Sequence, residues 1–108
     1  MTEHCLVLTT VDSADAANLL ARAAVQARAA ACAQVVGPIA STYRWDGELT
    51  TDQEWQVQFK TTVAALDRLR ELITALHSYD VPEIVAVPVL GGSAAYLRWV
   101  TDETRPTP

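Results

Sequence analysis

The segment from Glu83 to Leu90 is apolar at nearly every position and is the strongest constraint on how this chain folds. It is far shorter than the roughly 20 apolar residues that a membrane helix needs. A strand that is apolar on both of its alternating faces is typical of one that is covered on both sides. We therefore expect a strand here, with a covering layer over each of its faces.

A long hairpin is expected in the middle of the chain. Between Glu54 and Lys60, apolar and polar side chains alternate strictly, so this strand turns one side to the core. The Asp46-Gly47 dipeptide before it is typical of a tight hairpin turn, with Cys32–Trp45 as the partner strand. Pro38 has no N–H to donate to a ladder, and we expect a bulge or an edge position there.

A first strand and three helices complete the expected elements. Cys5–Thr10 is a short, apolar and β-branched run that predicts the strand. The helices are predicted by their helix-forming composition and by apolar residues that recur on one face. The first helix is Ala14–Ala31, with Asp12 or Ser13 as its cap. The second is capped by Thr61 or Thr62 and ends near His77, and the third is Ala94–Val100, capped by Ser93.

The order of these elements predicts an α+β fold, a ferredoxin-like βαββαβ sandwich with a long central hairpin and a short C-terminal helix. In this arrangement both main helices pack on one face of a four-stranded antiparallel sheet. A chain of 108 residues has room for a single domain, residues 1–108. Because Ile39, Tyr43 and Trp45 and the apolar last strand contribute to the other face, we expect another subunit to bury it.

The charge and cysteine content exclude several classes of function. With 8 basic and 13 acidic residues, the net charge is −5, and Lys60 is the single lysine, so nucleic acid and anionic membranes are poor partners. Cys5 and Cys32 lack the spacing of a disulfide framework or a CxxC site, and we expect buried, reduced thiols. No basic region precedes the first apolar stretch, so a cytoplasmic protein is expected.

Several spaced motifs run in order from about Leu6 to Val100. They are Ala31-Cys32-Ala33-Gln34, Ile39 to Gly47, Glu54, Lys60-Thr61, His77 to Ile84, Pro88, and Tyr96-Leu97-Arg98-Trp99. Together they resemble the CutA family, which is named for divalent-cation tolerance. An ordered match over most of the chain is far more specific than a single short motif.

The resemblance implies a homotrimer of ferredoxin-like subunits, similar in fold to the PII signalling proteins, whose hairpin strands reach across to neighbouring subunits. It also implies an association with copper and other divalent metals, and it does not imply an enzyme. The chain departs from the family pattern at Ser78, where proline is usual, and at Gln34, where a small residue such as asparagine is usual. Thr9 and Leu76 stand where some relatives have a cysteine and a histidine, which removes two potential metal ligands.

The candidate metal ligands are His77, Glu83 and Cys32, with copper or zinc as the expected ion. His77 and Glu83 flank a helix end and a strand start, so they can converge. In the alternative interpretation, His77 caps its helix or makes a hydrogen bond, and Glu83 pairs with Lys60 or an arginine. The residues favour this alternative, because the chain lacks the Cys and His spacing of a zinc site.

A second candidate site is a small-molecule cleft between subunits, with Lys60 or Arg44 binding an anionic group. Its expected residues are Tyr43, Trp45, Lys60, Tyr79, Tyr96 and Trp99. The alternative for these aromatic side chains is packing at a subunit interface. Since the chain contains no nucleophile elbow, phosphate-binding glycine loop or His-Glu-x-x-His motif, we expect no enzyme.

Two functions therefore remain open from the sequence. One is a trimeric divalent-cation tolerance protein that binds copper or another divalent metal ion in response to metal stress. The other is a PII-like trimer that binds a small effector molecule or serves as a protein scaffold, without a metal role.

Overall fold

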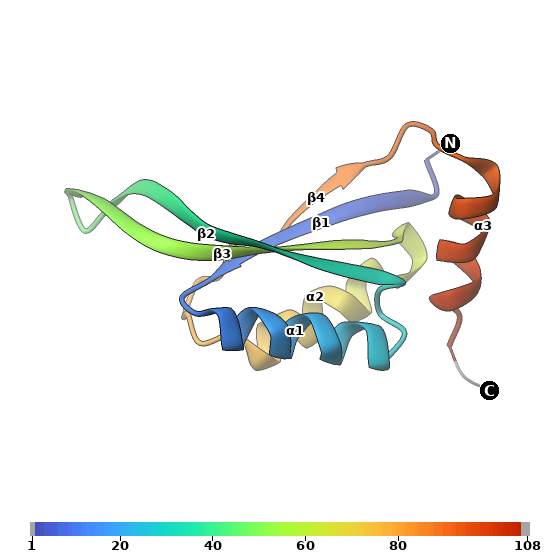
Figure 1. Ribbon diagram of the computed structural model, residues 1–108, viewed down its shortest axis with the longest axis horizontal. Coiled ribbons are helices and arrows are strands. Elements are labelled where there is room, and N and C mark those ends of the chain that lie inside the picture. Colours follow the sequence, from blue (N-terminus) through green and yellow to red (C-terminus); the bar gives the residue numbers. More distant parts are fainter. Residues whose placement is uncertain (1, 107–108) are drawn as a thin grey trace.

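The computed structural model describes residues 2–106 and confirms the α+β, ferredoxin-like fold (Figure 1). The elements are β1 (His4–Val11), α1 (Ala14–Gln26), β2 (Cys32–Trp45), β3 (Glu48–Thr62), the short 3-10 turn η1 (Val63–Ala65), α2 (Leu66–Leu76), β4 (Val85–Pro88) and α3 (Ala94–Glu103). The four strands form one antiparallel sheet in the order β2-β3-β1-β4. Helices α1 and α2 lie side by side below the sheet, and α3 stands at one end of it.

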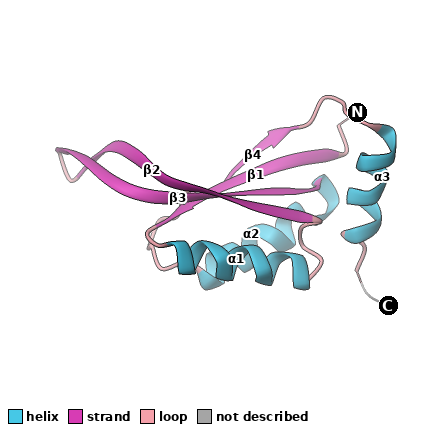
Figure 2. Cartoon of the chain, viewed as in Figure 1, coloured by secondary structure: helices cyan, strands magenta, loops and turns pink. Residues whose placement is uncertain are grey.

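The hairpin of β2 and β3 extends beyond the helical layer as a long, twisted arm, which we define as residues 39–54 (Figure 2). Trp45 pairs with Glu48, so the turn consists of Asp46 and Gly47, with φ values of 53° and 80°. Two consecutive positive φ values are typical of the predicted tight turn. β3 is longer than expected because the polar residues before Glu54 also pair with β2.

The expected bulge at Pro38 is confirmed. The register of β2 against β3 shifts between Val36 and Ile39, and the Gly37-Pro38 peptide bond is cis. Gly37 packs against Trp55 so closely that an added Cβ would overlap the indole ring and lie 3.1 Å from the Trp55 Cα. The bulge is thus fitted to one tryptophan on the facing strand.

This packing makes Gly37→Ala a sharp test. We expect the substitution to lower the free energy of unfolding by about 1–3 kcal/mol, because the new methyl group displaces a large side chain and its backbone. Gly91→Ala is the matched control, since a Cβ there has no neighbour within 4 Å. Chemical denaturation of both variants checks this, and equal stabilities would contradict the account.

The core lies between the sheet and α1 and α2. Val7 and Val11 of β1, together with Val57 and Phe59 of β3, face the helices and are almost fully buried. From the helices they meet Ala17, Leu20, Ala24, Leu69 and Ile73. The small alanine side chains of α1 let this helix approach the sheet closely.

The predicted extent of the first helix is wrong, because α1 ends at Gln26 and not at Ala31. Arg28 adopts a left-handed conformation with φ of 59°, and the N–H groups of Ala29 and Ala30 both donate to the carbonyl of Ala24. Ala29 and Ala30 are nearly fully buried in the core. Helix-forming residues therefore build a buried turn, because the chain has to reverse here to place β2 beside β3.

The other helix boundaries mostly agree with the sequence. Ser13 caps α1 and Ser93 caps α3, each by accepting a hydrogen bond from a backbone N–H of the first turn. Thr62 caps the 3-10 turn that precedes α2, and α2 ends at Leu76, directly before His77. α3 continues past the predicted end, to Glu103.

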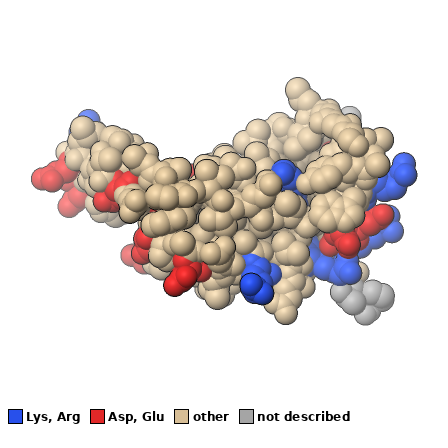
Figure 3. Space-filling model, in the orientation of Figure 1, with Lys and Arg blue, Asp and Glu red and all other residues tan. Residues whose placement is uncertain are grey.

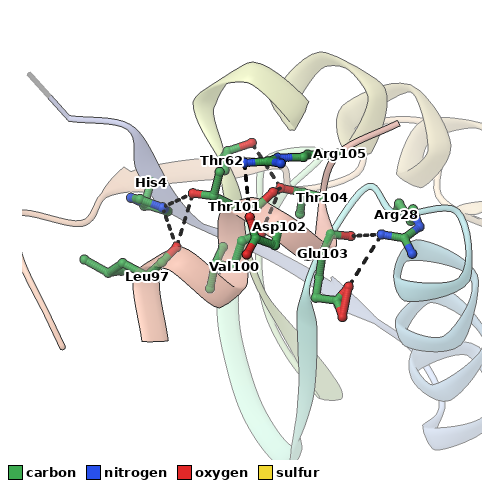
Figure 4. Close-up of polar contacts among 10 residues, drawn as sticks. All are labelled: His4, Arg28, Thr62, Leu97, Val100, Thr101, Asp102, Glu103, Thr104 and Arg105. Carbon is green, nitrogen blue, oxygen red and sulfur yellow. Dashed lines mark hydrogen bonds and ion pairs between the residues drawn. The ribbon is translucent and has the colours of Figure 1, made fainter. Parts of the chain in front are cut away.

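Helix α3 is fixed to the rest of the chain by polar contacts at several points (Figure 4). The Nε2 of His4 lies 2.8 Å from the Thr101 hydroxyl and 3.0 Å from the Leu97 carbonyl oxygen. Arg28, at the end of the first helix, reaches the backbone and carboxylate oxygens of Glu103. α3 therefore belongs to the same packed unit as the sheet.

The expectation of a strand covered on both faces is not met within one chain. β4 comprises only Val85–Pro88, at the edge of the sheet, and all four residues are exposed. Val85 and Val87 are 48% and 41% exposed. No helix or strand of residues 2–106 covers this edge, so the covering layer stays a prediction about assembly.

Among the described residues, no helix is long and apolar enough to cross a membrane. Both cysteines are free thiols, as expected. Cys5 is buried, and burial raises the pKa of its thiol. Cys32, the first residue of β2, is only half-buried, which corrects the expectation that both are buried.

Candidate functional site

A cleft with a volume of about 700 Å³ lies where the arm meets the loop after α2. Its walls come from the second half of β2, from one residue each of β3 and β1, and from the segment that connects α2 to β4. The lining residues are Thr10, Ser41, Thr42, Tyr43, Trp45, Glu54, Ser78, Tyr79, Asp80, Val81 and Glu83. We call this the arm cleft.

Strand register explains why these side chains meet. Beyond the bulge, β2 pairs with β3 so that Ile39 lies opposite Glu54 and Tyr43 lies opposite Thr50. Because side chains alternate across a strand, Tyr43, Trp45 and Glu54 share one face of the sheet, the face that α1 and α2 leave open. The loop after α2 then closes the side of the cleft with Tyr79.

Glu54 is the buried centre of the arm cleft. Only 7% of Glu54 is exposed, and its Oε2 accepts a 2.8 Å hydrogen bond from the hydroxyl of Tyr79. Burial, this hydrogen bond and the negative charge of Glu54 raise the pKa of Tyr79 far above its usual value. Farther along the arm, the Tyr43 hydroxyl donates to Asp52, and this hydrogen bond raises the pKa of Tyr43.

His77 positions Tyr79. The Nε2–H of His77 donates to the carbonyl oxygen of Thr10 over 2.8 Å, and Nδ1 accepts a 3.1 Å hydrogen bond from the backbone N–H of Tyr79. These partners define the tautomer, and both ring nitrogens are engaged. The rings of His77 and Tyr79 also contact each other, with centroids 4.8 Å apart. The geometry supports the interpretation of His77 as a hydrogen-bonding residue.

The predicted metal ligands do not come together within one chain. Glu83 lines the arm cleft, but Cys32 lies opposite Lys60, toward the other end of β3. Residues 2–106 contain no group of three or more His, Cys, Asp or Glu side chains able to hold a metal ion. With both nitrogens of His77 occupied, this donor set does not fit a metal centre built from one chain.

Thr9 offers no replacement ligand. It is fully buried on the helix-facing side of β1, and within the described part of the chain its hydroxyl has no hydrogen-bond partner. This position faces the apolar core, whereas the arm cleft lies on the opposite face of the sheet.

The predicted aromatic cleft divides into two places. Tyr43, Trp45 and Tyr79 line the arm cleft as expected. Lys60 and Tyr96 instead line a mostly apolar pocket of about 220 Å³ between the sheet and α3, and Trp99 lies against Tyr96 with ring centroids 5.5 Å apart. Within one chain, these three residues therefore lie apart from the arm cleft, and a cleft shared between subunits stays a prediction.

Neither of the two side chains expected to bind an anion, Lys60 and Arg44, lines the arm cleft of its own chain. The Lys60 ammonium group donates to the side-chain oxygen of Gln34 over 2.7 Å, and it pairs with neither Glu54 nor Glu83. Arg44 follows Tyr43 on β2, so strand alternation places it on the opposite face. The described residues that line the arm cleft include carboxylates and no lysine, arginine or histidine. The cleft is acidic.

Sequence reasoning missed Glu54 as the centre of the site and missed Asp80 and Ser41 in its lining. A signal for Glu54 was available. Counting outward from the Asp46-Gly47 turn places Glu54 opposite Ile39, on the same face as Trp45. Nothing in the sequence indicated how the loop after α2 folds back over this face.

The raised pKa of Tyr79 predicts a specific alkaline effect. The folded-state pKa of Tyr79 exceeds the ordinary tyrosine value of 10.0, so its neutral hydroxyl contributes fully to the free energy of unfolding below pH 10.0. This contribution is lost as the pH rises above 10.0 toward the folded-state pKa. We expect Tyr79→Phe to flatten the decline of unfolding free energy above that pH. Denaturant titrations at a series of alkaline pH values measure the free energy of unfolding of both proteins.

Tyr96→Phe is a control in the other pocket, where burial and Cys32 raise the tyrosine pKa. It should change the alkaline decline less than Tyr79→Phe, since its exposed fraction is 40% and it lacks a carboxylate partner. The same decline in Tyr79→Phe as in the parent protein would refute the role given to the contact between Tyr79 and Glu54.

Comparison with known proteins gives a consistent picture. Residues 5–103 match the family model described as CutA1 divalent ion tolerance protein. The divalent-cation tolerance protein CutA of Thermus thermophilus is 46% identical over 99 residues, covering 92% of this chain and 96% of that protein. The chloroplastic protein CutA of Arabidopsis thaliana is 41% identical over 100 residues, covering 93% of this chain and 55% of the plant protein.

Solved structures agree with this result. The chain is similar to the divalent cation tolerance protein from Thermus thermophilus, with a TM-score of 0.92, 44% identity and coverage of 94% and 99% of the two chains. It is also similar to CutA1 from Oryza sativa, with a TM-score of 0.94, 38% identity and coverage of 98% and 97%.

Proposed function

The chain belongs to the CutA1 divalent ion tolerance protein family, and we propose that it acts in cation tolerance as a non-enzymatic homotrimer that binds a small effector molecule. The observation that carries the effector role is the arm cleft, which combines a buried carboxylate with aromatic walls in a volume suited to a small ligand. No constellation of nucleophile and base accompanies it among the described lining residues, which supports a binding role over catalysis.

The effector proposal is tested on freshly purified protein by native mass spectrometry. We expect a bound small molecule in a fixed ratio to the subunits, and we expect Trp45→Leu to lose it, because Trp45 lines the cleft and is 64% exposed. Trp99→Leu, which alters the other pocket region, should retain it. A parent protein without any bound molecule under conditions that preserve the assembly would count against an effector.

The proposed trimer is supported by apolar surface that the chain leaves uncovered. Val85 and Val87 on β4 and Leu90 after it are exposed, with Leu90 at 97%. β4 is also an edge strand with hydrogen-bonding groups that no strand of residues 2–106 pairs on its outer side. Contact with another subunit would bury the exposed apolar side chains and pair the free hydrogen-bonding groups of the edge strand.

Sedimentation velocity tests the assembly. We expect a trimer at micromolar concentration and a shift toward monomer for Val87→Asp, since a buried charge on β4 opposes association. Leu19→Asp on α1 is the matched control, because Leu19 is also exposed, at 58%, but lies on a helix. A monomeric parent protein, or equal dissociation in both variants, would contradict an interface at β4.

Direct binding of copper or zinc is the second candidate function. It is favoured by the carboxylates of Glu54, Asp80 and Glu83, which line one cleft. Because the donors of one chain do not complete a metal centre, this function requires ligands from a second subunit.

Titration calorimetry with copper and zinc tests the metal role. If carboxylates of the cleft are ligands, Glu83→Gln should weaken binding at least tenfold, and His77→Gln should have a much smaller effect because both nitrogens of His77 are already engaged. A large loss in His77→Gln would restore the histidine as a ligand. The absence of saturable binding in the parent protein would eliminate direct metal binding.

We also keep the cytoplasmic location as a proposal. It is supported by the two free cysteines, since exposed or half-buried thiols such as Cys32 persist in reducing compartments.

A scaffolding role for the trimer is compatible with the exposed apolar residues of the arm, including Leu49 at its tip.

A further inference from the structure

We propose that the buried carboxylate of Glu54 forms an ion pair with the Lys60 ammonium group of a neighbouring copy of this chain, so that the next subunit completes each arm cleft. This inference rests on the proposed homotrimer and assigns one specific contact to it. Three features support it: two opposite charges on one face of the sheet that lack partners, a spacing that keeps them apart within a chain, and the pairing of different surfaces in a ring of three subunits.

The first feature is the charge state of the open face, beginning with Glu54. Only 7% of Glu54 is exposed, and a carboxylate that is removed from water needs a cation or several hydrogen-bond donors. Glu54 accepts one hydrogen bond, from the neutral hydroxyl of Tyr79, and pairs with no lysine, arginine or histidine of residues 2–106. Within one chain, its negative charge therefore stays without a counter-charge.

Lys60 has the opposite deficiency. It is half-buried, its ammonium group donates to the neutral side-chain oxygen of Gln34, and it pairs with no carboxylate in the described part of the chain. It is also the only lysine or arginine on the open face, because Arg44 lies on the other face of the arm and the remaining arginines lie on or next to helices. A subunit that covers this face buries the ammonium group, which then needs a negative partner.

The second feature is the position of the two charges on β3. Because side chains alternate along a strand, Glu54 and Lys60 point to the same face of the sheet, together with the two glutamines between them. Lys60 follows Glu54 by six positions, which at about 3.3 Å per residue corresponds to roughly 20 Å. The side-chain amide of Gln58 donates to that of Gln56, so the interval holds no charge. The two charges are therefore unable to meet within one chain.

The third feature is the symmetry of a cyclic trimer, in which each contact joins two different surfaces of the same chain. The open face offers two surfaces of opposite charge, since Glu54 lies at its arm end with Asp80 and Glu83 in the same cleft, and Lys60 lies beside α3. In Figure 3, acidic side chains gather at the arm end of the molecule, and most lysine and arginine atoms lie toward α3. Electrostatic attraction therefore favours contact between the arm end of one subunit and the open face beside α3 of the next.

Apolar surface next to Glu54 favours the same contact. Tyr43 and Trp45 share its face of the arm and are 38% and 64% exposed within one chain. A neighbouring subunit that covers these rings removes aromatic surface from water and also excludes water from the ion pair. In a drier environment, the attraction between the two charges is stronger.

A double-mutant cycle tests the ion pair in the assembled protein. The variants are Glu54→Gln, which keeps a hydrogen-bond acceptor for Tyr79, Lys60→Gln, and the two combined. Sedimentation in moderate urea measures the dissociation of each trimer. We expect each single substitution to weaken association at least about tenfold, because it leaves the opposite charge buried without a partner. The combined variant should be no weaker than the more affected single variant.

Glu48→Gln is the matched control, because it removes the same charge from the same face of β3, at the tip of the arm. It should weaken association less than Glu54→Gln does, and its effect should multiply with that of Lys60→Gln. If the effects of Glu54→Gln and Lys60→Gln multiply in the same way, the two residues are independent and the proposal is overturned.

Cross-linking of the parent protein gives a second measurement, since Lys60 is the single lysine of the chain. A carbodiimide activates a carboxyl group, and the amine then displaces the urea product and forms an amide bond, with one water molecule lost overall. We expect covalently linked subunits on a denaturing gel and a peptide that joins Lys60 to Glu54. A peptide that joins Lys60 to Glu83 in place of Glu54 would contradict the assigned pair.

Sedimentation of the parent protein separates the two proposals. A monomeric parent protein would refute the homotrimer and, with it, the ion pair. A stable trimer in which Glu54 and Lys60 show no coupling would refute the ion pair alone and leave the proposed assembly in place.

Discussion

The register of the β2–β3 hairpin is the constraint on which the rest of the structure depends. The two-residue turn at Asp46-Gly47 fixes which residues of the arm lie opposite each other, and the bulge at Gly37-Pro38 shifts that register once before the strands reach the core. Below the bulge, the pairing places Val57 and Phe59 against the helices. Above it, the pairing turns Glu54 toward the open face, so one hairpin builds both the core and the cleft.

Much of the fold could be predicted because its local signals and its tertiary structure agree. The Asp-Gly turn, the bulge at Pro38 and the exact limits of Cys32–Trp45 follow from turn chemistry and from the properties of proline. The predicted end of the first helix is wrong, because Ala27 to Ala31 have high helix propensity but pack as a turn. There, burial beside the sheet outweighs a small difference in propensity.

The site was less predictable, because it depends on a loop. Aromatic residues at the two ends of the sheet look alike in sequence, but within one chain α3 holds Tyr96 and Trp99 away from Tyr43. Similarly, His77 carries the residue type of a metal ligand, and only its partners show that both nitrogens are in use. Residue type indicates what a side chain is able to do, whereas its hydrogen bonds decide which of these abilities remains.

The two-residue turn also limits how the arm can change its length during evolution. Inserting one residue into each strand would keep the pairing but turn Tyr43 and Trp45 to the opposite face, because successive side chains alternate. Only insertions or deletions of two residues per strand preserve the face that lines the cleft. The arm is therefore expected to vary among homologous chains in steps of four residues, a rule set by the pleat of the strands.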